Sequence, residues 1–374
     1  MRGVAAIAGI GESDSWDVAG TGLTALDLIG QAAVAALDDA GLTAGDVDGL
    51  FTASAYYGMP GLNVGEYLGI RPRYSDSTNL GGASFVSHVQ HAAAAIGAGL
   101  CDVALVAYGS TQRADGGRLK SVAESFDVEA PYRPRYPISQ FALAAARHMH
   151  EFGTTREQLA EVAVAAREWA RPNERAFARE PLTVEDVLSS RMISEPLTSR
   201  DACLVTDGGG ALIVTSAERA AALRRPPALV LGGGEAHWHR NISQMPDLVR
   251  TAAAESGARA YERAGVTPEE VDAVEVYDAF TICTILFLED LGFCAKGEGG
   301  AFVSGGRIAP GGELPVNTNG GGLSYCHPGM YGIFLLAEAV RRIRGGDDVV
   351  LAHGNGAVLS AQSTVILGSA ATAP

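Results

Sequence analysis

The 374-residue sequence has a deficit of positive charge and no long apolar run. Its 28 lysines and arginines face 43 aspartates and glutamates, which gives a formal net charge of −15. Such a balance argues against sequence-independent binding to nucleic acid or to an anionic membrane surface. No stretch reaches the roughly 20 apolar residues that a membrane-spanning helix needs. The first residues lack a signal-peptide cleavage pattern. We therefore expect neither a nucleic-acid nor a membrane partner.

Cysteine is scarce and scattered. The five cysteines form no CxxC pair and are an odd number, which argues against a disulfide framework and against a cysteine-rich zinc site. No GxGxxG segment is placed as a dinucleotide-binding loop requires. His237 and His239 alternate on one segment without a third metal ligand nearby, which favours surface or pocket residues over a metal pair. We expect a cytoplasmic protein without a bound metal or a separate cofactor.

What is present is a strand–helix pattern that occurs twice. In the first half, a helix predicted over residues 24–40 ends at Gly41 and is followed by residues 42–48 and a strand. In the second half, a helix predicted over 249–264 is followed by the similar segment 266–272 and another strand. The two further helix–strand pairs that match each other are 83–109 and 333–352. Two such halves predict a duplicated α/β fold.

A segment of different composition, about 111–200, interrupts the first half. Its apolar fraction drops, its arginines become more frequent, and residues 140–152 and 156–171 have the spacing of amphipathic helices. We interpret it as an inserted, mostly helical domain. The resulting limits are 1–222 for the N-terminal half, which contains the insert, and 223–374 for the C-terminal half.

Four motifs in order resemble those of the thiolase superfamily, most closely its sterol-carrier-protein-x type. They are Asp207-Gly208-Gly209-Gly210, Tyr277-Asp278-Ala279-Phe280, Asn317-Thr318-Asn319-Gly320-Gly321 followed by Cys326-His327-Pro328, and His353-Gly354-Asn355-Gly356. The resemblance covers nearly the whole chain. It implies a five-layer α-β-α-β-α architecture of two thiolase halves with an inserted helical loop domain. It also implies a homodimer formed through the sheet edges of the first halves.

The thiolase nucleophile is missing from this sequence. The thiolase segment Cys-Ala-Ser-Gly aligns with residues 82–85, so that Gly82 stands where the reactive cysteine belongs. The second reactive cysteine is replaced by His353, and the asparagine that holds the oxyanion-hole water is replaced by Tyr277. Of the usual catalytic set only His327 is retained. Acyl transfer through the thiolase cysteine is therefore excluded.

A thiolase-like site without its nucleophile still holds an acyl thioester and stabilises its enolate. Retro-aldol cleavage of a β-hydroxyacyl-CoA needs that site and a base. The sequence resembles actinobacterial thiolase-like aldolases of steroid side-chain degradation, which lack the cysteines. This resemblance implies cleavage of a 17-hydroxy steroid with a three-carbon CoA ester into a 17-ketosteroid and propionyl-CoA. It further implies an OB-fold partner domain associated with an acyl-CoA hydratase. CoA is then part of the substrate, and arginines such as Arg113 or Arg147 are expected to bind it.

Six residues are expected to carry the chemistry: Tyr277, Asp278, Tyr325, His327, Tyr331 and His353. One or two of the tyrosines serve as the base and the proton relay. The histidines stabilise the enolate oxygen or return a proton to the α-carbon. Asp278 is expected to support these groups without contacting the substrate.

Two other functions stay open at this stage. One is an acyl-CoA acyltransferase or Claisen condensing enzyme that uses Ser84, Cys203 or Cys326 as an atypical nucleophile. The other is a non-catalytic acyl-CoA-binding homologue.

Overall fold

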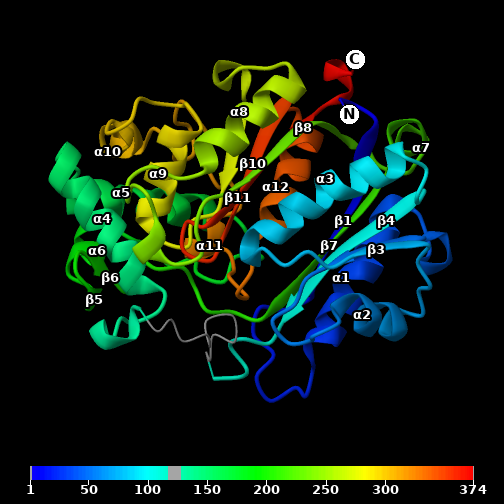
Figure 1. Cartoon of the computed structure of the whole chain (residues 1–374), viewed down its shortest axis with the longest axis horizontal. Helices are drawn as coiled ribbons and strands as arrows, with labels where there is room; N and C mark the ends of the chain where they lie inside the picture. The colour runs from blue at the N-terminus through cyan, green and yellow to red at the C-terminus, as the bar shows by residue number, and fades with distance from the viewer. Residues whose placement is uncertain (1, 117–127, 374) are drawn as a thin grey trace.

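The computed structural model describes residues 2–116 and 128–373, in which nine strands form one continuous sheet (Figure 1). Their order across the sheet is β3-β2-β4-β7-β1-β8-β11-β10-β9. The strands are β1 (Ala5–Glu12), β2 (Gly49–Thr52), β3 (Tyr74–Asp76), β4 (Val103–Ser110), β7 (Gly208–Ser216), β8 (Ala228–His237), β9 (Ala273–Val276), β10 (Val349–Gly356) and β11 (Ala361–Gly368). A separate hairpin consists of β5 (Met192–Ser194) and β6 (Leu197–Thr198).

The sheet is built from the same pairing scheme twice. In the first half β1 pairs antiparallel with β7, β7 antiparallel with β4, and β4 parallel with β2. In the second half β8, β11, β10 and β9 repeat these three pairings in the same order. The halves meet where β1 and β8 pair antiparallel over only two positions, Ala6 with Leu229 and Ile7 with Ala228. The predicted duplication is confirmed, with the addition that the two half-sheets are continuous.

The two half-sheets and the helices on their faces form five layers, as predicted. The helices are α1 (Ala25–Ala40), α2 (Pro60–Leu68), α3 (Ser84–Gly97), α4 (Ile138–Phe152), α5 (Arg156–Ala170), α6 (Val184–Leu188), α7 (Ala217–Ala221), α8 (Ala253–Ala264), α9 (Thr281–Asp290), α10 (Gly299–Val303), α11 (Gly321–Ser324) and α12 (Gly332–Gly345). Helix α1 packs on β1, β4 and β7, and α8 packs on β8 and β11. Helices α3 and α12 contact strands of both halves and form the middle layer. No helix within the two described ranges is long and apolar enough to cross a membrane.

Local sequence signals explain where these helices begin and end. Thr24 and Asp27 form a capping box at the start of α1, and Gly41 ends it with φ 75°. Gly265 ends α8 in the same way with φ 66°. The predicted start of α8 at residue 249 is wrong by four residues. Thr251 instead donates its backbone N–H to Asp290 at 2.7 Å, and this contact with α9 holds the chain outside the helix.

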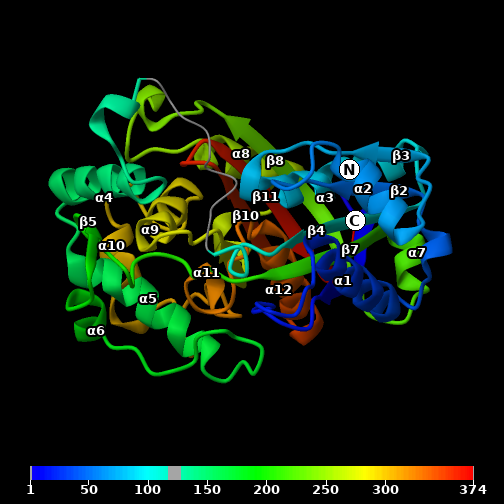
Figure 2. The ribbon, with the colours of Figure 1, turned by 90° about the horizontal axis from the view of Figure 1, so that it is seen from below.

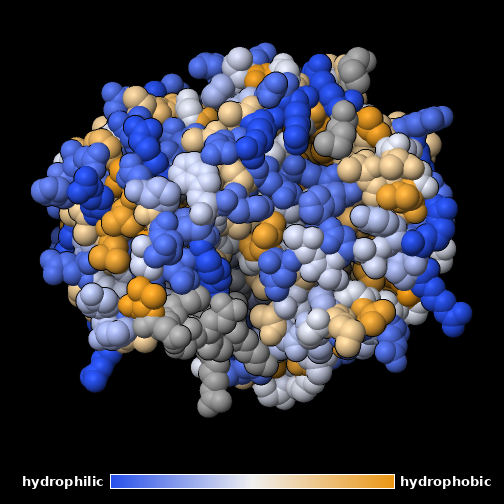
Figure 3. All heavy atoms as spheres, in the orientation of Figure 1, coloured by the Kyte–Doolittle hydropathy of each residue, from blue (hydrophilic) through white to orange (hydrophobic). Residues whose placement is uncertain are grey.

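The predicted helical insert lies between β4 and β7 and contains α4, α5 and α6. It occupies one end of the molecule beside α9 and α10 of the second half, while β2, α1 and α2 lie at the other end (Figures 1 and 2). A buried ionic cluster fastens it there. His148 of α4 contacts Glu289 of α9 at 3.0 Å, and Lys296 contacts the same carboxylate at 3.0 Å. The face seen in Figure 3 is mostly hydrophilic, with hydrophobic residues scattered over it.

Glycines in the paired strands β1 and β8 allow the outer helices to approach closely. A Cβ at Gly9 would lie 2.2 Å from the Ala36 carbonyl oxygen of α1, and one at Gly232 would lie 2.5 Å from the Ala260 carbonyl oxygen of α8. Both distances are shorter than van der Waals contact, so each helix lies directly against the strand backbone.

We expect Gly9→Ala and Gly232→Ala each to lower the free energy of unfolding by about 1–3 kcal/mol, because the added methyl group forces helix and strand apart. Urea unfolding measures this. Gly345→Ala is the control, since a Cβ there meets no atom within 4 Å. Equal stability of all three variants would contradict the packing argument.

Candidate active site

A cavity of about 640 Å³ lies between the insert, the second half and residues 55, 79–82 and 112. Most of its wall is apolar and includes Ile138, Phe141, Leu204, Val205, Phe280 and Met330. Its polar residues include Gln112, Cys203, His237, His239, Tyr277 and His327. An apolar wall with a few polar groups suits a largely hydrophobic ligand that is oriented at a small number of atoms.

Tyr277 and His327 meet on the wall of this cavity. Tyr277 follows β9 directly, and its hydroxyl group lies 3.0 Å from Nε2 of His327. The same hydroxyl oxygen accepts the backbone N–H of Tyr331 at 3.1 Å. Tyr331 turns its own hydroxyl away and donates to Asn319 Oδ1 at 2.9 Å. The structure therefore combines Tyr277 and His327 as one hydrogen-bonded pair, with Tyr331 supporting it through its backbone.

Burial keeps this pair neutral. It raises the pKa of Tyr277 well above its ordinary value of 10 and lowers the pKa of His327 to about 4. At neutral pH the tyrosine is protonated and the imidazole is uncharged. Proton transfer between them is then the route by which Tyr277 can take a proton from a bound ligand.

Gly82 provides the space that Tyr277 occupies. A Cβ at Gly82 would lie 2.0 Å from Cε2 and 2.6 Å from Cζ of the Tyr277 ring. It would also lie 2.7 Å from the Asn355 carbonyl oxygen. A side chain at residue 82 and the Tyr277 ring in its observed place exclude each other.

Tyr325 lies outside the cavity wall, in a buried ionic cluster. Its hydroxyl donates to Glu12 at 2.6 Å, and Glu12 also contacts Arg341 at 2.9 Å and Arg175 at 3.3 Å. Burial and the nearby Glu12 raise the pKa of Tyr325 well above 10. The predicted catalytic role of Tyr325 stays a prediction, and its contacts in the structure are those of a residue that joins β1 to the segment after α11.

His353 and Asp278 lie behind the wall. His353 bonds to Thr364 Oγ1 at 2.8 Å and to Gln362 Oε1 at 2.9 Å, and burial lowers its pKa to about 3. Its carbonyl accepts the backbone N–H of Tyr277 at 3.0 Å. Asp278 accepts the backbone N–H of Gly322 at 2.6 Å, and burial raises its pKa to about 6. Both residues bond to the backbone around the site, and the predicted catalytic role of His353 stays a prediction.

The three atypical nucleophiles differ in their access to the cavity. Ser84 is fully buried and accepts the Leu80 backbone N–H at 2.8 Å, and Cys326 is fully buried as well. Cys203 lines the cavity, but burial raises the pKa of its thiol.

Neither arginine proposed from the sequence for CoA lines the cavity. Arg113 contacts Asp17 at 2.9 Å, and Arg147 contacts Glu151 at 2.8 Å. Arg240 is the arginine on the wall. His237 and His239 also lie there. The residues that the structure describes contain no group of three or more His, Cys, Asp or Glu side chains that could hold a metal ion.

The chain is similar in sequence to several known proteins. Residues 234–369 match the thiolase C-terminal domain-like family. A steroid side-chain-cleaving aldolase from Thermomonospora curvata is 36% identical over 92% of this chain and 91% of its own length. The chain belongs to the thiolase superfamily. A 17-hydroxy-3-oxo-4-pregnene-20-carboxyl-CoA lyase from Mycobacterium tuberculosis is also 36% identical, over 92% of both chains.

Some relatives of this thiolase-superfamily protein are named as acyltransferases and not as lyases. An acetyl-CoA acetyltransferase from Methanothermobacter thermautotrophicus is 33% identical over 92% of both chains. Among solved structures, the Ltp2-ChsH2(DUF35) aldolase superposes with a TM-score of 0.89 and 34% identity, over 98% of both chains. Sequence identity to the lyases, 36%, is only slightly higher than identity to the acyltransferase, 33%. The distinction between the two activities therefore rests on the residues of the site.

We expect Gly82→Ala to reduce turnover at least 100-fold, because the methyl group displaces the Tyr277 ring and misplaces its hydroxyl group. Steady-state kinetics with thermal unfolding as a folding check measures the effect. Gly345→Ala serves as the control. Full activity of a folded Gly82→Ala protein would show that the Tyr277 ring need not lie where it does.

The buried neutral histidines predict a pH dependence of stability. Because the folded-state pKa of His327 is about 4 and its ordinary value is 6.5, the unfolded chain binds the proton first as the pH falls. Stability present above pH 6.5 is lost between pH 6.5 and 4, by about 2 kcal/mol between pH 7 and 5. We expect His327→Gln to flatten this slope in urea unfolding, whereas exposed His150→Gln leaves it unchanged. An unaltered slope in His327→Gln would contradict the assignment.

Proposed function

We propose that this thiolase-superfamily protein is a carbon–carbon lyase that cleaves a β-hydroxyacyl-CoA by a retro-aldol reaction. Its substrate is a 17-hydroxy steroid with a three-carbon CoA ester side chain, and its products are a 17-ketosteroid and propionyl-CoA. The observation that carries the proposal is the replacement of a nucleophile at residue 82 by the hydrogen-bonded pair of Tyr277 and His327. The names of the relatives in Thermomonospora and Mycobacterium support the same chemistry.

The reaction begins at the substrate hydroxyl group. Tyr277 passes its proton to Nε2 of His327 while its oxygen takes the proton of the β-hydroxyl, so the two transfers are coupled. The O–H bond of the substrate breaks, the C=O bond of the ketone forms, and the Cα–Cβ bond breaks. Its electron pair passes to the thioester as an enolate. The backbone N–H of Tyr331 stabilises charge that develops on the phenolic oxygen.

The reaction ends with the return of the proton. Burial makes the imidazolium form of His327 unfavourable in free energy, which is why its pKa is low. The enolate in the same water-poor cavity offsets that cost while both charges exist. His327 and Tyr277 then deliver the proton to the α-carbon, which yields propionyl-CoA and restores the neutral pair. No atom of the protein is acylated at any stage.

The cavity supports a bulky apolar substrate. Its volume of about 640 Å³ lies in the usual range for ligand pockets. The aromatic rings of Phe141 and Phe280 lie on its wall with centroids 4.5 Å apart and planes inclined at 33°, where they give an apolar surface. A fused ring system fits such a surface because it buries apolar area without losing rotational freedom.

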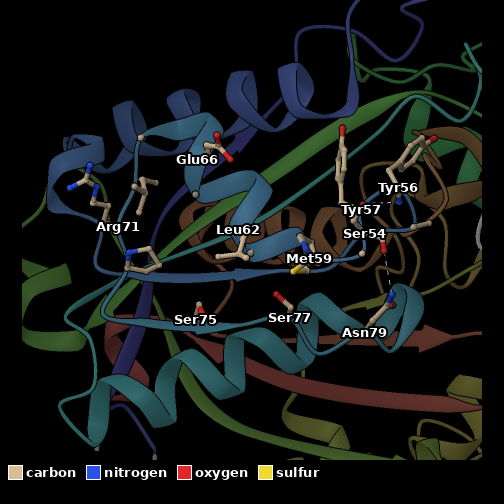
Figure 4. A pocket seen from close by; sticks show the side chains of 18 residues that line it. Ser54, Tyr56, Tyr57, Met59, Leu62, Glu66, Arg71, Ser75, Ser77 and Asn79 are labelled. Carbon is tan, nitrogen blue, oxygen red and sulfur yellow. Dashed lines mark hydrogen bonds between the residues drawn. The ribbon is translucent and has the colours of Figure 1, made fainter.

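We further propose that the chain forms a homodimer through the first half. Strand β3 is the outer strand of the sheet on that side. Beside it lies a groove between α2 and the segment from Ser75 to Asn79, shown in Figure 4. Met59 and Leu62 project there and are 68% and 70% exposed. A second copy would cover this apolar surface.

A second protein component is also proposed. The matched aldolase bears the joint name Ltp2-ChsH2(DUF35), which fits the OB-fold domain expected from the sequence resemblance. The activity of this chain is therefore to be measured with and without such a domain.

We expect the chain, assayed with the candidate OB-fold domain, to convert the 17-hydroxy steroid CoA ester to equal amounts of 17-ketosteroid and propionyl-CoA, as detected by mass spectrometry. Tyr277→Phe removes the hydroxyl that accepts the substrate proton and should lower kcat by about 10²–10⁴-fold. Cys203→Ala is the control for the acyltransferase alternative and should retain cleavage. Recovery of intact substrate, or of an acylated protein that Cys203→Ala abolishes, would refute the lyase proposal.

A further inference from the structure

Gln112 is a buried residue on the cavity wall whose amide nitrogen has no hydrogen-bond partner among the described residues. The residue is 4% exposed, and its Nε2 atom has no partner in the described part of the chain. Its backbone N–H donates to Ser110 Oγ at 3.2 Å, so the main chain is held although Nε2 of the side chain is not bonded. A buried amide donor that is left unpaired costs about 1–3 kcal/mol. Such a group on the wall of a ligand cavity indicates that a ligand atom completes its bonding.

Gln112 and Tyr277 both lie close to Gly329. A Cβ at Gly329 would lie 2.8 Å from Oε1 of Gln112, and the Gly329 carbonyl oxygen lies 3.4 Å from the Tyr277 hydroxyl. Gly329, Gln112 and Tyr277 all line the main cavity. A second void beside Gln112 measures about 10 Å³, which is room for one water at most. The second void is too small for a substrate, whereas the main cavity is large enough and has Gln112 on its wall.

The proposed reaction leaves one requirement unassigned in this site. Tyr277 and His327 act on the β-hydroxyl, and their hydrogen bond occupies Nε2 of His327. The thioester oxygen, which gains the negative charge of the enolate, still needs a donor. The hydroxyl oxygen and the thioester oxygen of a β-hydroxyacyl group are separated by three carbon atoms. A donor for the second oxygen must therefore lie close to Tyr277 without being part of its pair.

We propose that the Nε2 amide group of Gln112 donates a hydrogen bond to the thioester oxygen and stabilises the enolate that forms there. This inference rests on the proposed retro-aldol function and assigns its oxyanion donor. A neutral amide suits the role, because it loses little on binding the uncharged thioester and gains strength as charge develops on the oxygen. It provides no proton and forms no covalent bond with the substrate.

The test measures enolate formation apart from steroid cleavage. The protein, with its candidate OB-fold domain, is incubated with propionyl-CoA in D₂O, and exchange of the α-hydrogens is followed by mass spectrometry. We expect Gln112→Met and Gln112→Glu to slow this exchange about 10²–10³-fold, the usual effect of losing one oxyanion donor. The Kd for propionyl-CoA should change less than threefold in Gln112→Met, and kcat for cleavage should fall with little change in KM.

Gln31→Met is the matched control, since Gln31 lies on α1 and its Oε1 atom accepts only the Asp14 backbone N–H. It should exchange like the wild type, and thermal unfolding should show all variants folded. Normal exchange and normal kcat in Gln112→Met would overturn the role of Gln112 and leave the lyase proposal standing. Wild-type protein that neither exchanges nor cleaves would overturn both. If the wild type cleaves the substrate without exchange, the kcat of Gln112→Met for cleavage is the test. A fall in this kcat supports the role of Gln112, and an unchanged kcat overturns it.

Discussion

The site depends on one steric exclusion, between residue 82 and the ring of Tyr277. The ring fills the volume that any side chain at position 82 would enter, with the first clash at 2.0 Å. A chain with this backbone can therefore place a side chain at residue 82 or the ring of Tyr277 in its observed position, but it cannot place both. The proposed reaction depends on this exclusion, because a nucleophile at residue 82 and the Tyr277 hydroxyl group cannot share the site.

Two residues that resemble catalytic groups in the sequence, His353 and Asp278, make contacts that hold this arrangement, while their catalytic roles stay predictions. The carbonyl of His353 accepts the Tyr277 N–H, which extends the parallel pairing of β10 with β9 by one residue. Asp278 accepts the N–H groups of Gly322 and Leu323 and so fixes the turn that carries His327. Burial raises the pKa of Asp278 to about 6, while the backbone N–H groups of Gly322 and Leu323 that it accepts oppose this rise.

The sequence predicts the repeated elements well because each carries local signals. Amphipathic spacing marks α1, α5 and α12, and glycines mark the ends of α1 and α12. Continuous apolar runs mark β4 and β10. Strand β8 extends to His237, well beyond the residues 228–231 that its apolar run predicts, because Gly232, Gly233 and Gly234 lie against side chains and helix backbone from other segments. That contact is tertiary, and no local pattern shows it. Helix α9 is buried on all sides and therefore lacks amphipathic spacing, and the sequence pattern did not indicate it.

Because tertiary contacts leave no local sequence pattern, only some residues of the site could be predicted. Tyr277 and His327 could be predicted because motifs place them, and both line the cavity. Tyr325 belongs to the same motif, yet its hydroxyl turns to Glu12, since the direction of a side chain depends on packing between α11 and β1. Gln112 stands in no motif, and only the missing partner of its amide marks it.

The duplicated fold explains why this chemistry sits at the middle layer. Helices α3 and α12 occupy equivalent places in the two halves, and both begin beside the Tyr277–His327 pair. Gly332 at the start of α12 approaches Gly82 so closely that a Cβ there would lie 2.1 Å from the Gly82 carbonyl oxygen. Two helix N-termini thus meet in one buried region, and each carries a partial positive charge. The Tyr277–His327 pair is itself neutral, and these helix N-termini place partial positive charges beside it. The site needs both halves, because Gly82, which leaves room for the Tyr277 ring, comes from the first half and the hydrogen-bonded pair comes from the second.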